Sequence, residues 1–241
     1  MSEYIIKKVT DTNIIKLADY ILPNDNVFLA GGIFKWLFRF DREDKLVLFG
    51  SPDYEIYQAR KRDFDLFSYS EEGFNNVKNY FEVECPDYYN LDEHFGSYGT
   101  LNNSAVYEHK SDRLTVHLDL VHKFFGSPEE ILEQFDFTVT QCALYKKDGL
   151  VYLIYSDSFK NDFTSRTLAY VTTPDRSEHV LDRLIKYIDY GFTPSEETIK
   201  QGLSVALKDT LWGNVEVEKL FKSDSLDMIK KVSKVLRLVQ R

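Results

Sequence analysis

The sequence predicts an α+β fold: a mixed β-sheet with flanking helices, followed by a smaller helical C-terminal region. Apolar and alternating runs typical of strands lie mainly before residue 160, whereas helical periodicity prevails from Pro174 onward. Hydrophobic residues make up 43% of the 241 residues, enough to form a packed core. We therefore expect an α+β domain over residues 1–160 and a helical domain over residues 161–241.

Hydrophobic periodicity and the positions of turn residues predict the individual strands and helices. The expected strands cover residues 27–30, 63–67, 105–109, 114–121, 138–144 and 150–155. The expected helices cover residues 11–21, 33–40, 71–81, 128–135, 180–190 and 225–238.

Local signals support several of these boundaries. Asp11 or Thr12 can cap the first helix. The segment Ser127–Glu130 is a capping box with proline at the first helical position, and residues 193–196 form a second box. Gly191 ends the helix that begins at Val180.

The composition excludes several functional classes. Thirty basic residues against 39 acidic ones give a formal net charge of −9, the opposite of a protein that coats nucleic acid by neutralising phosphates. No run approaches the roughly 18 consecutive apolar residues of a membrane span, and the first residues lack a secretory pattern. Cys85 and Cys142 are too few for a disulfide framework or a zinc site. We expect a soluble, cytoplasmic protein.

The strongest chemical signal is the pair Asp63 and Asp65 on a predicted strand. Alternate side chains of a strand share a face, so both carboxylates point the same way while Phe64 and Leu66 point into the core. Neighbouring carboxylates repel each other unless a cation lies between them, and Mg²⁺ prefers oxygen ligands. The alternative is two solvated aspartates on an exposed face.

A second signal is Gly31-Gly32 between a predicted strand and a predicted helix. Glycines let a phosphate approach the backbone closely, and the amides of a helix N-terminus attract anions. The alternative is a tight turn that binds no ligand.

In combination, these features resemble the DNA polymerase beta-like nucleotidyltransferase superfamily, and within it a branch found largely in phages and large DNA viruses. The residues that carry the resemblance are Gly31-Gly32, Asp63–Phe67, Ser127–Glu130, Phe135–Phe137 and Arg183–Tyr187. The resemblance implies a nucleotidyltransferase-like mixed sheet and, for a viral chain, a location in the host cytoplasm. The gap between Gly32 and Asp63 is longer than usual for the superfamily, so we expect a charged insertion over about residues 41–57.

The third carboxylate that the superfamily requires has two candidates. Asp119 alternates with Leu118 and Leu120 on a predicted strand, which favours a position beside the Asp63–Asp65 pair. Asp136 lies just after a helix, where it could equally be a structural cap.

Basic residues near these motifs could hold a triphosphate. Lys35 follows the glycine turn, and Arg60 and Arg62 precede the acidic strand. Arg183 and Lys186 share one helix face, which the resemblance makes a phosphate or nucleotide contact. The basic face of the last helix, residues 225–238, could bind RNA; for each of these cations the alternative is a solvated surface.

These observations predict a nucleotidyltransferase that moves an NMP from an NTP to an RNA end, a protein hydroxyl or a small molecule. Asp63, Asp65 and Asp119 would hold Mg²⁺ or Mn²⁺, and Gly31, Gly32, Lys35, Arg183 and Lys186 would bind the nucleotide. One alternative is a catalytically silent copy of the fold that captures a nucleotide or a host protein. Another is an unrelated α+β protein in which these residues coincide by accident.

Overall fold

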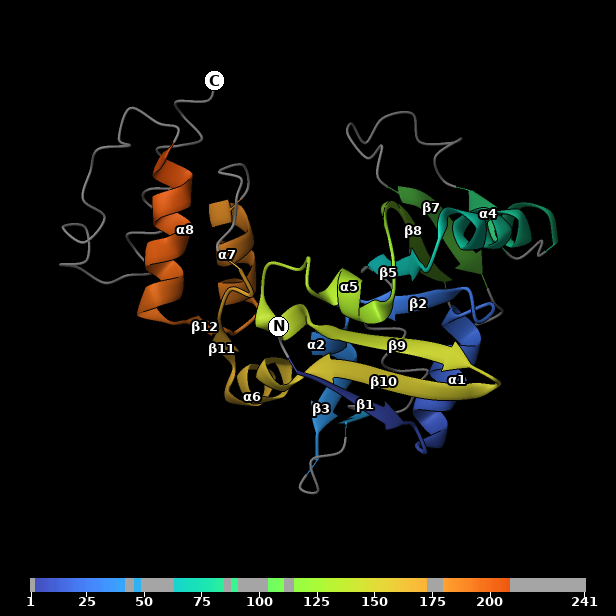
Figure 1. Ribbon diagram of the computed structural model, residues 1–241, viewed down its shortest axis with the longest axis horizontal. Helices are drawn as coiled ribbons and strands as arrows, with labels where there is room; N and C mark the ends of the chain where they lie inside the picture. The colour runs from blue at the N-terminus through green and yellow to red at the C-terminus, as the bar shows by residue number, and fades with distance from the viewer. Residues whose placement is uncertain are drawn as a thin grey trace. The chain divides into compact units, whose positions relative to one another are not determined.

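The computed structural model describes residues 3–41, 46–48, 63–84, 88–90, 104–110, 115–172 and 180–208 (Figure 1). The chain forms two compact units. The first comprises residues 1–135 and 140–161, and the second comprises residues 136–139 and 162–241. No helix in the described part of the chain is long and apolar enough to cross a membrane.

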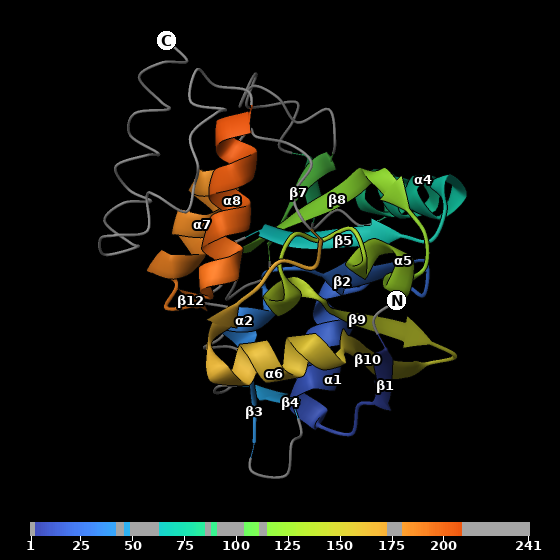
Figure 2. The same ribbon diagram turned by 60° about the vertical axis from the view of Figure 1, so that its left-hand side comes forward.

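An eight-stranded mixed sheet is the centre of the first unit. In spatial order its strands are β1 (Tyr4–Lys8), β10 (Leu150–Ser156), β9 (Cys142–Lys147), β2 (Val27–Ala30), β5 (Asp63–Ser68), β8 (Thr115–Phe125), β7 (Ser104–Lys110) and β6 (Tyr88–Asn90). The β5–β8 pair is parallel, whereas the pairs on either side of it, β2–β5 and β7–β8, are antiparallel (Figure 2). This sheet and its helices confirm the predicted α+β class.

Helices cover both faces of the sheet. Helix α5 (Pro128–Leu132) packs on one face, where Ile131 and Leu132 meet Phe28, Phe67 and other buried apolar residues. We call this side the α5 face. Helix α1 (Thr12–Ile21) lies behind the β9–β10 hairpin in Figure 1, on the opposite face, and helix α4 (Glu71–Asn79) packs against β8 and β5.

The capping signals of the sequence are realised in two helices of this unit. The Asp11 carboxylate accepts hydrogen bonds from the backbone N–H groups of Asn13 and Ile14, at 2.8 and 3.2 Å. At α5, Ser127 and Glu130 form both hydrogen bonds of a capping box. These contacts confirm both predicted helix starts, because each satisfies amides that have no partner within the helix.

The predicted helix over residues 33–40 is wrong in its second half. Helix α2 covers only Phe34–Leu37, and Phe38–Phe40 forms strand β3, which pairs with β4 (Leu46–Leu48) inside the charged stretch. Phe38 is buried and Arg39 exposed, an alternation that suits a strand edge better than a helix. The sequence of Phe38–Phe40 shows neither a helical nor a strand periodicity. Its conformation is therefore set by pairing with β4, which lies further along the chain.

Other predicted boundaries are also corrected. Helix α5 ends at Leu132 rather than residue 135, and Thr138–Thr140 is a 3₁₀ turn rather than the start of a strand. Strand β1 and helix α6 (Asp157–Ser165) were not predicted. The proposed insertion lies mostly outside the described residues.

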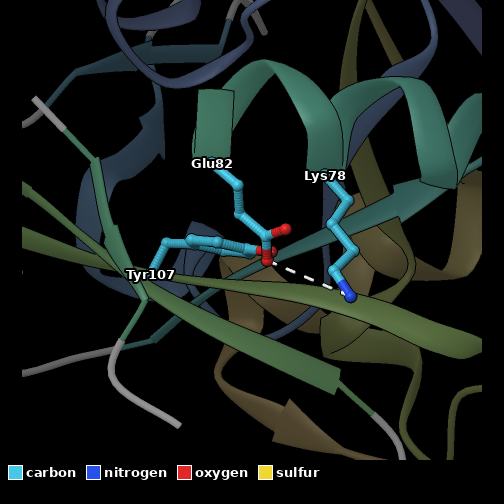
Figure 3. Close-up of polar contacts among 3 residues, drawn as sticks. All are labelled: Lys78, Glu82 and Tyr107. Atoms are coloured by element: carbon cyan, nitrogen blue, oxygen red, sulfur yellow. Dashed lines mark hydrogen bonds and ion pairs between the residues drawn. The ribbon is translucent and has the colours of Figure 1, made fainter. Parts of the chain in front are cut away.

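Helix α4 continues into a π-helical turn, Tyr80–Glu84, that is fastened to β7. The buried Tyr107 hydroxyl donates a 2.9 Å hydrogen bond to the Glu82 carboxylate, and Lys78 Nζ lies 4.0 Å from the same oxygen (Figure 3). The Tyr107 ring also packs 4.9 Å from that of Phe81. These contacts hold α4 against the half of the sheet that contains β5 and β8.

The second unit contains helices α7 (Val180–Asp189) and α8 (Glu196–Lys208) and the short parallel pair β11 (Thr167–Leu168) and β12 (Thr193–Pro194). Gly191, with φ +85°, follows α7 as predicted. The predicted capping box at residues 193–196 is corrected: Ser195 alone caps α8, accepting a 3.1 Å hydrogen bond from the Thr198 N–H. The predicted helix over residues 225–238 lies outside the described residues.

Candidate active site

Strands β5 and β8 bring two predicted site residues side by side. The parallel register pairs Asp65 with Asp119 and Asp63 with His117. Phe64 and Leu118 are fully buried on the opposite face, while Asp65 and Asp119 are half-buried on the α5 face. Because adjacent strands lie about 4.8 Å apart, two carboxylates stand next to each other on one side of the sheet.

The glycine turn lies directly against this acidic strand. A Cβ atom at Gly31 would be 3.5 Å from Asp65 Oδ2, and the backbone there has φ +93°, a conformation that L side chains rarely adopt. The turn follows β2, the antiparallel neighbour of β5. Gly31, Asp65 and Asp119 therefore form one cluster within the first unit.

Lys35 lies near the same cluster, and its side chain bends back to the glycine turn. Its ammonium donates a 2.6 Å hydrogen bond to the carbonyl of Gly32, and the residue is 8% exposed. The contact holds a positive charge beside the glycine turn.

Phe135 forms a wall of the site, a role that the sequence reasoning did not assign. Its Cζ atom would lie 3.5 Å from a Cβ at Gly31, and its ring meets that of Phe67 edge-on at 5.8 Å. The segment Phe135–Phe137 is one of those that carry the family resemblance, but the sequence analysis assigned no role to Phe135.

A buried polar network fixes the end of α5 that leads to Phe135. Gln141 Nε2 donates a 3.0 Å hydrogen bond to the carbonyl of Leu132, and Gln141 Oε1 accepts a 2.8 Å bond from Ser156 Oγ. Ser156 Oγ in turn accepts from the Phe159 N–H at 3.0 Å. Because these groups are shielded from water, their bonds strongly favour one position of the helix end.

The donor set suits a hard divalent cation. Among the described residues no group of three or more His, Cys, Asp or Glu side chains could hold a metal ion. The side chain of Asp63 lies outside that description, so the described donors are the two carboxylates of Asp65 and Asp119. Carboxylate oxygens are the ligands Mg²⁺ and Mn²⁺ prefer, and Mg²⁺ usually keeps several waters beside one or two carboxylates.

The remaining predicted site residues lie in the second unit or outside the description. Arg183 Nε is 2.7 Å from Asp136 Oδ2, an ion pair within the second unit, and Lys186 is exposed on the same helix. Of the two candidates for the third carboxylate, Asp119 thus lies beside Asp65, whereas Asp136 is held by Arg183. Arg60 and Arg62 lie outside the described residues.

Solved structures similar to this chain include enzymes that process tRNA. A CCA-adding enzyme in complex with ATP has a TM-score of 0.56 at 14% identity, over 95% of this chain and 55% of that one. A Thermotoga maritima CCA-adding enzyme complexed with tRNA has a TM-score of 0.49 at 15% identity, over 95% and 54%. This chain therefore spans a little over half the length of these enzymes. The first likeness shows that this chain shares the fold of that CCA-adding enzyme.

Sequence comparison provides the family. No curated protein matches the sequence. The model of the Gabija anti-defense 2 family matches residues 2–166, a range that contains β1 to β10, the glycine turn and the Asp65–Asp119 pair. Since the match extends over more than half of the chain, this protein belongs to the Gabija anti-defense 2 family.

Proposed function

We propose that this protein is a metal-dependent nucleotidyltransferase that transfers an NMP from an NTP to an acceptor. The observation that carries the proposal is the cluster of Gly31, Asp65 and Asp119: a Cβ atom at Gly31 would lie 3.5 Å from the Asp65 carboxylate, which is paired in register with that of Asp119. The nucleotidyltransferase fold supports it.

Each residue has a role in this proposal. Asp65 and Asp119, with Asp63 two residues earlier on β5, would hold Mg²⁺ or Mn²⁺. The metal would neutralise the triphosphate and lower the pKa of the attacking hydroxyl. Gly31 and Gly32 leave room for phosphate oxygens to reach the backbone, and Lys35 adds a positive charge beside them.

Membership of the Gabija anti-defense 2 family supports a role for this chemistry in anti-defense. The acceptor is an RNA end, a protein hydroxyl or a small molecule, and transfer of a nucleotide onto any of these would alter its charge and its recognition. The fold shared with a CCA-adding enzyme makes an RNA end a natural first acceptor to test. Arg183 and Lys186, on helix α7, remain proposed nucleotide contacts.

The test is label transfer from each α-labelled NTP, with Mg²⁺, to total cellular RNA and protein. Asp63→Asn combined with Asp65→Asn should lower transfer about a thousandfold, because metal catalysis contributes several kcal/mol and each 1.36 kcal/mol is tenfold. The thermal midpoint should stay unchanged or rise, since two neighbouring negative charges are removed. Asp189→Asn, an exposed carboxylate at the end of α7, is the matched control and should transfer normally.

Two outcomes would overturn the proposal. Transfer that persists in the double variant would show that β5 does not hold the metal. Nucleotide binding that is equally tight without Mg²⁺, with no pyrophosphate released, would identify the protein as a binding module that retains only the fold.

A further inference from the structure

The α5 face of the sheet changes from acidic to apolar directly beyond the two carboxylates. Asp65 and Asp119 lie side by side on β5 and β8, and two residues further along each strand the same face carries Phe67 and Val121. Phe67 belongs to the apolar cluster under α5, and Val121 packs against that cluster. A ligand that spans this boundary would meet charged groups at one end and apolar side chains at the other.

The half-buried ring of Phe135 lies at this boundary. Its edge approaches the glycine turn, because Cζ and Cε2 are 3.5 and 4.0 Å from the position of a Cβ atom at Gly31. Asp65 Oδ2 is 3.5 Å from the same position, so the ring and the carboxylate both border this point of the backbone. Among the described residues, Phe67 alone has an aromatic ring in contact with Phe135, and their planes meet at 71°. Such an edge-on contact covers at most one face of the Phe135 ring.

Hydrogen bonds of the chain around α5 fix the position of Phe135. The carbonyl of Leu132 accepts one hydrogen bond from the Phe135 N–H, at 3.4 Å, and another from Gln141 Nε2, at 3.0 Å. Gln141 is 1% exposed and accepts a hydrogen bond from Ser156 Oγ, so it is itself held in place. Because the backbone that carries the ring is already ordered, a ligand that binds to Phe135 loses little affinity to the ordering of this segment.

These surroundings suit the two ends of a nucleotide. In the proposed function the negatively charged triphosphate lies at the glycine turn, beside Lys35 and the metal. The other end of the nucleotide is a flat aromatic base, and any base can stack on a phenyl ring whatever hydrogen-bonding groups its edge carries. An aromatic ring beside the phosphate-binding turn therefore favours recognition of the base through its ring face.

We propose that Phe135 is the stacking surface for the base of the bound nucleoside triphosphate. This inference rests on the proposed function, because it takes the triphosphate to lie at the glycine turn. It adds a substrate class to that function. The site accepts all four common bases, and it binds purine nucleotides more tightly than pyrimidine nucleotides because a purine offers the larger ring face to Phe135.

The experiment measures the binding of two probes to the full chain by calorimetry, in the presence of Mg²⁺. The first probe is α,β-methylene-ATP, which cannot donate its NMP, and the second is inorganic tripolyphosphate, which lacks the nucleoside. We expect the wild-type chain to bind the ATP analogue at least about fivefold more tightly than tripolyphosphate. The corresponding GTP analogue should bind like the ATP analogue, and the CTP and UTP analogues should bind more weakly.

Variants of Phe135 isolate the contribution of the ring. Phe135→Leu keeps an apolar side chain beside Phe67 and should lower the affinity for the ATP analogue at least about fivefold. Its affinity for tripolyphosphate should not change, a difference that a misfolded variant would not show. Phe135→Tyr keeps the ring and should retain both affinities. The matched control is Phe124→Leu, which removes an exposed phenyl ring elsewhere on β8 and should change neither affinity.

The outcomes separate this inference from the proposed function. If the wild-type chain binds neither probe, the proposed function is refuted and the inference with it. If it binds both probes equally tightly, or if Phe135→Leu keeps the preference for the ATP analogue, only the stacking inference is refuted. A ribotrinucleotide that binds more weakly to Phe135→Leu, while the ATP analogue binds as before, would assign the ring to the acceptor and would also overturn the inference.

Discussion

Replacing Gly31 with alanine tests how closely the glycine turn approaches the acidic strand. Gly31 has φ +93°, so an L side chain there costs about 1–2 kcal/mol of backbone strain. The new methyl would lie 3.5 Å from Asp65 Oδ2 and 3.5 Å from Phe135 Cζ, which is ordinary contact and adds no steric cost. In a chain of this size 1 kcal/mol lowers the thermal midpoint by about 2–4 °C, so we expect a fall of about 2–8 °C.

The same methyl should affect nucleotidyl transfer far more than stability. It occupies the space in front of the backbone where the proposed triphosphate would lie, so transfer should fall at least about tenfold while the protein stays folded. Gly149→Ala is the matched control: Gly149 has φ +71° and nothing within 4 Å of its Cβ position. It should show a similar fall in midpoint and normal transfer.

Calorimetry and label transfer on the two variants separate the possible outcomes. A midpoint that falls much further in Gly31→Ala than in Gly149→Ala would mean that the turn is packed more tightly than the 3.5 Å contacts indicate. Wild-type transfer by Gly31→Ala would refute the reasoning that phosphates approach this turn.

Three further predictions concern two buried residues, Gln141 and Cys142, and the partly exposed Tyr69. Gln141→Leu should lower the free energy of unfolding by about 2–4 kcal/mol in urea titration, because the Leu132 carbonyl and the Ser156 hydroxyl lose a buried partner. Cys142 is fully buried and burial raises its thiol pKa, so a thiol reagent should modify it only after unfolding, as peptide mass spectrometry can show. Burial raises the pKa of Tyr69 from 10.0 to about 12, so above pH 10 only the unfolded state loses this proton; stability should fall as pH rises towards 12, and ultraviolet titration should detect the late phenolate.

Much of the first unit follows from local sequence signals. The Asp11 cap and the Ser127–Glu130 capping box each start a helix where the sequence places it, because a cap depends on residues three or four positions apart. The paired strands over residues 104–110 and 115–125 follow from the alternation of apolar and polar residues, a pattern that indicates a sheet with one buried face. These features depend on near neighbours, so the sequence alone contains them.

The errors arise where distant residues decide the structure. Residues 38–40 form a strand because Leu46–Leu48 offers them a partner, and no helical or strand period within Phe38–Phe40 could reveal that pairing. Strand β1 has two lysines among its five residues and joins the sheet at its edge beside β10, so its apolar signal is weak. Tertiary pairing therefore overrides local preference at both places.

The candidate site shows the same division. Alternation along β8 indicates that Asp119 faces away from Leu118 and Leu120, but it gives no information on which strand lies next to it. The parallel β5–β8 register supplies that information and pairs Asp119 with Asp65. Asp136 has an equally suggestive sequence context, between two phenylalanines, yet the chain places it in the second unit beside Arg183. Topology, rather than residue type, separates the two candidates.

The short length of α5 keeps this helix clear of the proposed active site. A helix of five residues spans about 7.5 Å at 1.5 Å per residue, far less than the width of eight strands at about 4.8 Å spacing. It buries the aliphatic and phenyl groups under it and does not extend over the carboxylates and the glycine turn beyond its C-terminal end. A longer helix would cover this region, so extending α5 by a designed turn at its C-terminus should abolish nucleotidyl transfer while the thermal midpoint reports a folded protein. Wild-type transfer by the extended chain would contradict the proposed position of the triphosphate.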